Sequence, residues 1–344
     1  MIIVRSPMRV SFFGGGTDHP TWFRTGEPAA VLSTTIDKYL YVTLRKLPLV
    51  FNFNYRVSWR IIEEVQTLRE IEHPIVRAVL QNYGDDCDSG YEVLYNADLP
   101  AQSGLGSSSA FTVAMLKAYL GNQGKLESKQ FFAREAIRIE QDLLKEPVGS
   151  QDQIAAAYGG LNQITFAADD TFTVEPILIT SERKRALNDN LMMFFTGFTR
   201  SASKIEGEKI VNMASKREEM HALFEMVQEG RHILEDTSRD LDDFGRLLGD
   251  AWARKRALSD AVSNSSLDDA YEAAIRAGAL GGKLLGAGGG GFLLFYVEPH
   301  KQDAVKVALK PMIDMQFRFE NAGASVVLYN PDLQSNYDTS LRYE

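Results

Sequence analysis

A short loop rich in glycine and serine constrains this chain of 344 residues more than any other segment. A strand-like stretch, 91–95, precedes it, and an apolar helical stretch, 111–119, follows it at once. Such a loop gathers unpaired backbone N–H groups at the positive end of a helix dipole, an arrangement that favours phosphate. We therefore expect the chain to hold a nucleotide triphosphate. The expected contacts are Pro100, Gln102, Ser103, Gly104, Leu105, Gly106, Ser107, Ser108 and Ser109.

Three better-known phosphate motifs do not fit the chain. The segment 277–284 comes nearest to G-x-x-x-x-G-K-[ST], but it lacks the first glycine and the final hydroxyl. The segment 286–291 matches G-x-G-x-x-G, yet it precedes a strand-like run instead of following a strand and opening a helix. The tripeptide 243–245 reads Asp-Phe-Gly, but it lies too close to the Ser-Arg-Asp-Leu at 238–241 for a protein-kinase site. We interpret that last match as coincidence.

Composition excludes several classes of protein. The net charge is −9 and the chain has no long basic run, which argues against nucleic acid or an anionic membrane as the main partner. No apolar stretch approaches the roughly 18 residues of a membrane span, and residues 1–5 read as the start of a strand, not as a signal peptide. The single cysteine, Cys87, cannot form a disulfide framework and fits a reducing cytoplasm. The five histidines are scattered without metal-ligand spacing.

The pattern of strands and helices predicts an α+β protein with two domains. Apolar residues make up 44% of the chain, enough for a sizeable core, and its length suits two domains. The first half is rich in strands and the second is a helical block with few strands, so we expect domains at 1–178 and 179–344. The segment 181–189 reads as a polar linker. Strands are expected at 2–13, 29–45, 51–62, 91–95, 191–196, 292–297 and 325–329; helices are expected at 74–82, 111–119, 128–144, 151–158, most of 202–261, 267–277 and 302–315.

Three glycine-rich elements stand at the start, middle and end of the chain, at 6–18, 100–110 and 283–292. In this order and over nearly the whole chain, they resemble the GHMP kinase superfamily, which includes galactokinase, homoserine kinase, mevalonate kinase and phosphomevalonate kinase. The resemblance implies a ribosomal protein S5 domain 2-like N-terminal domain and a ferredoxin-like C-terminal domain. It also implies an active site in the cleft between them, with the glycine-rich loop at 286–291 packed against it.

Within the superfamily the chain looks most like the D-glycero-D-manno-heptose 7-phosphate kinases. The resemblance rests on the segments 14–18, 149–160 and 196–203. Many relatives carry lysine at the place of Ser150, and this departure does not touch the acid that follows. The implied activity is ATP-dependent phosphorylation of the anomeric hydroxyl to give the 1,7-bisphosphate, in nucleotide-activated heptose biosynthesis for surface polysaccharide. The alternatives are another sugar 1-kinase, of fucose or mannose type, or a non-catalytic sugar- or nucleotide-binding regulator.

The resemblance assigns catalytic roles to Asp152 and Arg9. Asp152 follows a helix break at 147–149, and the resemblance makes it the base that takes the proton of the sugar hydroxyl. From the residues alone, the favoured interpretation is an acid at a helix N-terminus that the helix dipole stabilises, and the resemblance reverses that preference. Arg9 occupies the basic position of the first motif, where it could stabilise phosphoryl charge or lower the pKa of Asp152. The alternative is a surface arginine on a strand.

The resemblance also implies Mg²⁺ alongside ATP. Glu140 lies twelve positions before Asp152, about the separation at which the family places a Mg²⁺-binding glutamate. Glu135 and Glu146 are near rivals. Ser108 matches the hydroxyl that completes the metal shell, with Ser107 and Ser109 as substitutes. One carboxylate and one hydroxyl leave room for phosphate oxygens and water, as Mg²⁺ prefers.

The acceptor sugar phosphate needs its own contacts. The resemblance places Gly16, Thr17 and Asp18 at the sugar hydroxyls, and the backbone of Gly288 and Gly289 close to the ligand. Residue type alone makes Arg200 the leading candidate to hold the sugar's phosphate. The substitutes are Lys204 and then the basic residues 254–256. A homodimer is left open.

Overall fold

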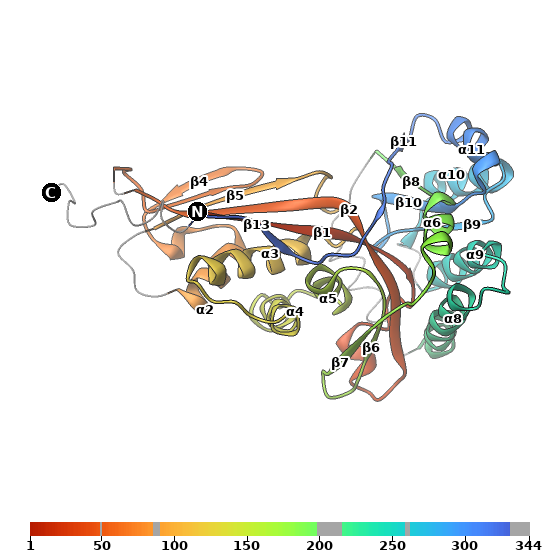
Figure 1. The fold of residues 1–344 in the computed structure, drawn as a ribbon, viewed down its shortest axis with the longest axis horizontal. Coiled ribbons are helices and arrows are strands. Elements are labelled where there is room, and N and C mark those ends of the chain that lie inside the picture. Colours follow the sequence, from red (N-terminus) through yellow and green to blue (C-terminus); the bar gives the residue numbers. More distant parts are fainter. Residues whose placement is uncertain (49, 85–89, 198–214, 259–261, 331–344) are drawn as a thin grey trace.

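A nine-stranded sheet carries the first half of the chain, and a four-stranded sheet carries the second (Figure 1). The computed structural model describes residues 1–48, 50–84, 90–197, 215–258 and 262–330. The large sheet has the order β13-β1-β2-β5-β3-β4, and β6, β7 and β12 join it beside this path. Its strands are β1 (Ile2–Phe13), β2 (Ala29–Lys46), β3 (Tyr55–Ser58), β4 (Ile62–Val65), β5 (Tyr91–Ala97), β6 (Leu161–Phe166), β7 (Phe172–Pro176), β12 (Phe319–Glu320) and β13 (Ser325–Tyr329).

The two long strands β1 and β2 form the spine of the large sheet. They pair antiparallel along almost the whole of β1, and their register shifts twice, between Pro7 and Met8 and between Ser11 and Phe13. A β-bulge bends a strand and redirects its side chains, and bulges are frequent beside active sites. The two irregularities flank Arg9, so this residue lies in the most distorted part of an otherwise regular pair.

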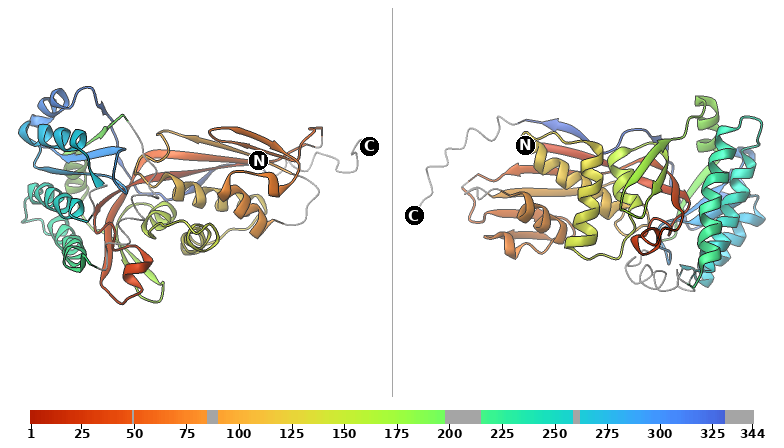
Figure 2. Two further views of the ribbon diagram at one scale, coloured as in Figure 1. Left: turned by 180° about the vertical axis from the view of Figure 1, so that it is seen from behind. Right: turned by 90° about the horizontal axis from the view of Figure 1, so that it is seen from below.

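Four helices cover one face of the large sheet (Figure 2). They are α2 (Pro74–Tyr83), α3 (Ser107–Asn122), α4 (Lys129–Ile137) and α5 (Gln151–Tyr158). The central helix α3 buries apolar side chains around its whole circumference, including Val113, Met115 and Leu116. A helix that is apolar all round belongs in the interior. Its N-terminus is therefore fixed by the core, which holds the glycine- and serine-rich loop in place.

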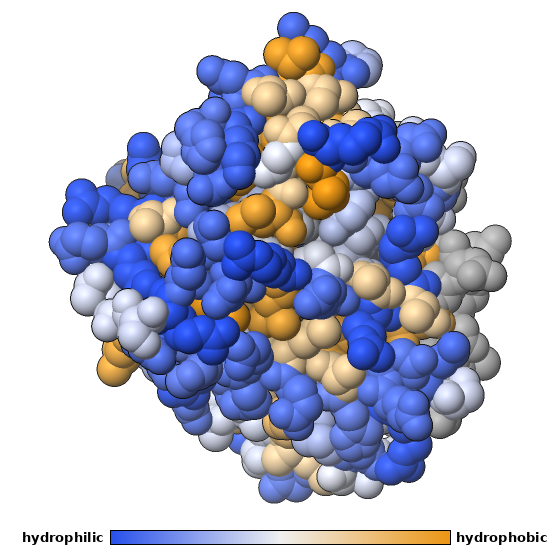
Figure 3. All heavy atoms as spheres, turned by 90° about the vertical axis from the view of Figure 1, so that its right-hand side faces the viewer, coloured by the Kyte–Doolittle hydropathy of each residue, from blue (hydrophilic) through white to orange (hydrophobic). Residues whose placement is uncertain are grey.

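The second sheet has the order β11-β8-β10-β9 and is antiparallel throughout. Helices pack around it to form a compact block beside the end of the large sheet (Figures 1 and 2). The outer face of this block is mostly hydrophilic, with hydrophobic residues in small patches between the polar ones (Figure 3). Its elements are α6 (Ser181–Asp189), β8 (Leu191–Phe195), α8 (Arg217–Glu235), α9 (Asp242–Arg256), α10 (Ser265–Arg276), β9 (Gly281–Leu284), β10 (Phe292–Tyr296), α11 (Gln302–Ala308) and β11 (Ile313–Asp314).

The α+β class expected from the sequence is confirmed, with several corrections to individual elements. The expected linker at 181–189 is the helix α6, capped by the Thr180 side chain. The helix expected at 302–315 ends at Ala308. The helix expected at 128–144 begins after its predicted cap, Ser128, but turns into a π-helix at Arg138–Leu143. The strands β12 and β13 return from the second half to the large sheet, and the division at residue 178 stays a prediction. None of the helices in the described ranges has the length and apolar character needed to cross a membrane.

His73 is a buried titratable group in the first half. Its ring lies 4.7 Å from that of Trp59 and 4.8 Å from that of Phe111. Its Nδ1 accepts a hydrogen bond from the backbone N–H of Val76 at 3.5 Å and so caps α2. Burial lowers the pKa of His73 to about 4, because the apolar surroundings disfavour the charged ring.

The protein should lose stability as pH falls from about 6.5 towards 4, and His73 should account for part of that slope. Over this range the unfolded chain binds a proton at this histidine while the folded chain does not, so stability rises with pH. Replacing His73 by Asn keeps a capping side chain and removes the titration. We expect H73N to flatten the pH dependence of the urea unfolding midpoint between pH 4 and 6.5. His300→Asn, at an exposed histidine, is the control and should keep the wild-type pH dependence. An unfolding midpoint that changes with pH equally in H73N and in wild type would contradict the role of His73.

Candidate active site

The glycine- and serine-rich loop connects β5 to the N-terminus of α3, as the sequence predicts. Gly104 and Gly106 adopt positive φ angles of 81° and 73°, which are left-handed conformations that glycine reaches without strain. Part of the loop lines a cavity: Gln102, Gly104, Gly106, Ser107, Ser108 and Ser109. The other three expected contacts do not line it. Ser103 and Leu105 are fully buried beneath the loop, and Pro100 is exposed.

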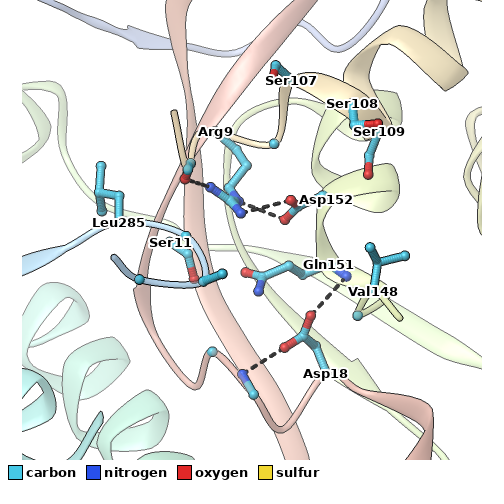
Figure 4. Close-up of a pocket in the computed structure, with 18 of the residues that line it drawn as sticks. Arg9, Ser11, Asp18, Ser107, Ser108, Ser109, Val148, Gln151, Asp152 and Leu285 are labelled. Atoms are coloured by element: carbon cyan, nitrogen blue, oxygen red, sulfur yellow. Dashed lines mark hydrogen bonds and ion pairs between the residues drawn. The ribbon is translucent and has the colours of Figure 1, made fainter. Parts of the chain in front are cut away.

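Arg9 and Asp152 form a bidentate ion pair in this cavity (Figure 4). Arg9 Nε lies 2.7 Å from Asp152 Oδ1, and Arg9 Nη2 lies 2.8 Å from Asp152 Oδ2. The remaining arginine nitrogen, Nη1, donates to the carbonyl of Gly104 at 2.5 Å. The Arg9 side chain is only 7% exposed, whereas that of Asp152 is 23% exposed. The carboxylate is therefore oriented by the arginine while it stays accessible from the cavity.

Asp18 lies on the other side of the cavity floor (Figure 4). Its carboxylate accepts hydrogen bonds from the backbone N–H groups of Gly16 at 2.9 Å and Gln151 at 3.4 Å. Gly149 makes room for it, since a Cβ at this position would lie 2.0 Å from Asp18 Oδ2. Gly16 and Asp18 line the cavity, but Thr17 does not. The Thr17 hydroxyl is buried and donates to the carbonyls of Gly14 and Ala30, so it holds the turn together.

The third glycine-rich loop closes the cavity from the second half of the chain. Its residues Gly286, Gly288 and Gly290 line the cavity, whereas Gly289 lies behind it and donates its N–H to the carbonyl of Val262. Only glycines permit the approach to the first half. A Cβ at Gly286 would lie 2.4 Å from the Cα of Gly104.

Two buried lysines add positive charge to the same wall. Lys255, from α9, donates to the carbonyls of Leu284 and Gly286. Lys283, from β9, donates to the carbonyl of Phe12 at 2.6 Å. Both ammonium-bearing side chains line the cavity together with Arg9. The cavity therefore combines three cationic side chains with the carboxylates of Asp18 and Asp152, a lining suited to an anionic ligand.

Glu140 lies just behind the serines, on the π-helix Arg138–Leu143. It is fully buried, and its carboxylate accepts hydrogen bonds from Ser109 Oγ at 2.8 Å, Thr112 Oγ1 at 2.5 Å and Gln153 Nε2 at 2.6 Å. Burial raises the pKa of Glu140 to about 7, and the nearby charge of Asp152 acts in the same direction. No basic side chain forms an ion pair with Glu140 in the described ranges. A π-helical turn often marks a functional position in a helix.

Comparison with known proteins identifies the family. Residues 70–160 match the model of the GHMP kinases N terminal domain, and residues 232–312 match that of the GHMP kinases C terminal domain. A D-glycero-alpha-D-manno-heptose 7-phosphate kinase from Campylobacter jejuni is 30% identical over 320 residues, which cover 90% of this chain and 93% of that protein. The chain belongs to the GHMP kinase family. It is an enzyme, an ATP-dependent phosphotransferase.

Other GHMP kinase relatives agree with this assignment. A bifunctional fucokinase/GDP-fucose pyrophosphorylase from Arabidopsis thaliana is 28% identical over 320 residues, which cover 85% of this chain and 29% of that protein. A crystal structure described as a D-glycero-D-manno-heptose 1-phosphate kinase from Bacteroides thetaiotaomicron superposes with a TM-score of 0.77 at 24% identity, covering 96% of this chain and all of that one (100%). At that identity the superposition shows the common fold.

Sequence reasoning missed several residues that line the cavity, and one expected residue lies outside the described ranges. Arg200 and its substitute Lys204 belong to 198–214, which the structure does not describe. Ser11 was within reach, because it lies two positions after Arg9 and side chains two apart share one face of a strand. Gln151 directly precedes Asp152. Lys255 was expected only within the basic residues 254–256, as a further substitute for the phosphate contact, because the tertiary fold alone brings α9 to this wall.

Proposed function

We propose that this GHMP kinase transfers the γ-phosphoryl group of ATP to the anomeric hydroxyl of D-glycero-D-manno-heptose 7-phosphate and forms the 1,7-bisphosphate. The arrangement of Asp152 carries the proposal. An accessible carboxylate, held in a fixed orientation by Arg9, faces a cavity that also contains the N-terminus of α3. The sugar assignment is supported by the heptose 7-phosphate kinase from Campylobacter jejuni, which matches nearly the whole chain.

Different residues of the site would bind the substrates, accept the proton and orient the proton acceptor. The triphosphate lies against the N–H groups and hydroxyls of 102–109, where the helix dipole favours negative charge. The anomeric oxygen attacks the γ-phosphorus, its proton passes to Asp152, and the bond to the ADP oxygen breaks. Arg9 holds the carboxylate in a fixed orientation, because its guanidinium binds both oxygens. Asp18 accepts hydrogen bonds from sugar hydroxyls.

The residues around Glu140 fit a magnesium ion. The candidate ligands are oxygen atoms of Glu140, Ser108 and Ser109, and oxygen is the ligand that Mg²⁺ prefers. Ser109 contacts Glu140 and lines the cavity, Ser108 lines the cavity, and Glu140 lies outside its lining. The buried carboxylate is also costly to ionise without a cation nearby, as its raised pKa shows. When bound, Mg²⁺ neutralises the charge of the β- and γ-phosphates. Of the rival glutamates, Glu135 forms an ion pair with Arg138.

The runner-up is another sugar 1-kinase, of fucose type, since 29% of the length of the bifunctional Arabidopsis protein matches 85% of this chain. A non-catalytic regulator is disfavoured, because Arg9, Asp152 and the α3 N-terminus meet in one cavity. A panel of heptose, mannose and fucose substrates, free and phosphorylated, incubated with ATP and followed by phosphorus NMR decides between them. A 1,7-bisphosphate as the main product supports the proposal, and turnover of free fucose alone refutes it. The homodimer that the sequence leaves open stays untested.

Asp152→Asn should lose most turnover while it keeps nucleotide affinity. The substitution preserves size and one hydrogen bond to Arg9 but removes the proton acceptor, a contribution of about 10²–10⁴-fold. The measurement is the steady-state kcat, together with ATP binding by calorimetry. Asp142→Asn, an exposed acid on the preceding segment, serves as the control. A kcat for D152N within about threefold of wild type would remove the residue from this role.

Glu140→Gln should raise the Mg²⁺ concentration required for half-maximal activity. The amide keeps the shape of the side chain and loses the negative charge that a divalent cation needs. Glu135→Gln on the adjacent helix is the matched control, and its magnesium titration should follow that of the parent. Identical titrations for E140Q and wild type would overturn the assignment. The test would then move to Glu146.

Arg200→Ala should weaken binding of the sugar phosphate about tenfold or more and leave ATP binding unchanged. A charge-assisted hydrogen bond is worth about 1.5–3 kcal/mol, and 1.4 kcal/mol is a factor of about ten. The control is Arg256→Ala, because Arg256 is paired with Asp268. Equal weakening of both substrates would place Arg200 on the transferred phosphoryl group. No change in either would move the phosphate contact to Lys204 and then to the basic residues 254–256, of which Lys255 lines the described cavity.

A further inference from the structure

Two polar side chains in the cavity have hydrogen-bonding atoms that the protein leaves unused. Ser11 Oγ and Gln151 Oε1 are buried, and neither finds a hydrogen-bond partner among the described residues. Both side chains line the cavity (Figure 4). Ser11 is more than nine-tenths buried. A buried polar group without a partner costs free energy, so its partner is expected to be a ligand when it faces a ligand cavity.

Position separates these two groups from other unpartnered polar atoms in the chain. Ser6 Oγ on the same strand and Gln163 Oε1 on β6 are also buried without partners. Neither of them lines the cavity. Ser6 and Gln163 therefore also have a buried hydrogen-bonding atom without a partner, but a ligand in this cavity cannot reach either atom.

Both side chains border the space that a side chain at position 15 would occupy. A Cβ at Gly15 would lie 3.9 Å from Ser11 Oγ and 4.0 Å from Gln151 Nε2. Gly15 has no side chain, so the space between the two groups stays open to the cavity, which Gly15 also lines. The shift of register between Ser11 and Phe13 lies directly beside this space, and such irregularities re-aim strand side chains.

The chemistry of this space suits a hydroxyl group. A glutamine amide offers an acceptor oxygen and an NH₂ donor group, and a serine hydroxyl donates and accepts through one atom, so together they match hydroxyls that donate and accept. A phosphate is a poor match, because Asp18 lies beside Gln151 and its carboxylate bonds the Gln151 backbone N–H at 3.4 Å. An apolar group would leave both side chains unsatisfied.

The residues next to Ser11 and Gln151 indicate which hydroxyl of the acceptor sugar these two side chains would bind. Ser11 lies two residues from Arg9 on β1, and Gln151 directly precedes Asp152 on α5. We propose that Ser11 and Gln151 bind the acceptor hydroxyl adjacent to the one that is phosphorylated, and so restrict the enzyme to acceptors with two neighbouring hydroxyls. This inference rests on the proposed function, in which Asp152 faces the reacting oxygen.

The test compares D-glycero-D-manno-heptose 7-phosphate with its 2-deoxy analogue, at saturating ATP, on the full chain. Wild type should prefer the complete sugar in kcat/KM by about tenfold or more, since a site built to bind a hydroxyl discriminates against its absence. Gln151→Met and Ser11→Ala should each raise the KM for the complete sugar and leave the KM for the 2-deoxy analogue and for ATP unchanged. In both variants the ratio of kcat/KM for the complete sugar to that for the 2-deoxy analogue should therefore be smaller than in wild type.

Ser6→Ala and Gln163→Met are the matched controls and should keep the wild-type preference. Ser11→Ala removes a single oxygen and should leave the fold intact. If Gln151→Met lowers the thermal unfolding midpoint, the Ser11 variant alone decides the test. The inference would be overturned if the Ser11 and Gln151 variants raised the KM for both sugars equally, or left both KM values unchanged. If wild type phosphorylates a different sugar of the panel, the heptose assignment fails. The same comparison with that sugar and its deoxy analogue then still decides the role of the two residues.

Discussion

The bidentate pair between Arg9 and Asp152 is the interaction on which the rest of the site depends. It joins β1 to α5 across 143 positions of sequence and adds a third bond from the arginine to the carbonyl of Gly104. A paired charge can be kept in a cavity wall, whereas an isolated one would be costly to bury. The pair also requires a glycine at its edge, since a Cβ at Gly106 would lie 3.1 Å from Asp152 Oδ2. The loop, the strand and the helix must therefore be placed together.

Closure of the cavity comes from contacts between backbones in the two halves of the chain. A Cβ at Gly291 would lie 2.3 Å from the carbonyl oxygen of Ser103, so the third glycine-rich loop packs directly on the second. Lys283 reaches from β9 to the carbonyl of Phe12 and ties the same loop to β1. The absence of side chains at these positions is a requirement of packing as well as of ligand binding. It explains why three glycine-rich segments far apart in sequence belong to one site.

The parts of the fold and of the site that can be predicted are those that a local sequence pattern determines. The spine of the large sheet and the helix after the glycine- and serine-rich loop follow from apolar runs broken by glycine, and both are observed. The segment of α6 resembles a linker in sequence because only Leu187 of its residues is buried, so the helix has almost no apolar face. The pairing of Glu140 with Ser109 depends on a π-helical turn that no sequence pattern announces. Lys255 is brought to the cavity by tertiary packing alone.

One strand and the turn after it supply several of the groups that define the site. Within ten residues the chain supplies the guanidinium of Arg9, the hydroxyl of Ser11, the carbonyl of Phe12 that accepts from Lys283, and the carboxylate of Asp18. These groups share one backbone, so their spacing is set by the register of β1 on β2 and by its irregularity between Ser11 and Phe13. Arg9 and Ser11 lie two positions apart, so the strand carries both side chains on one face. The same strand therefore places charge, hydroxyl and backbone acceptor at one floor, and it connects the proposed contacts to the acceptor with the orientation of the Asp152 carboxylate.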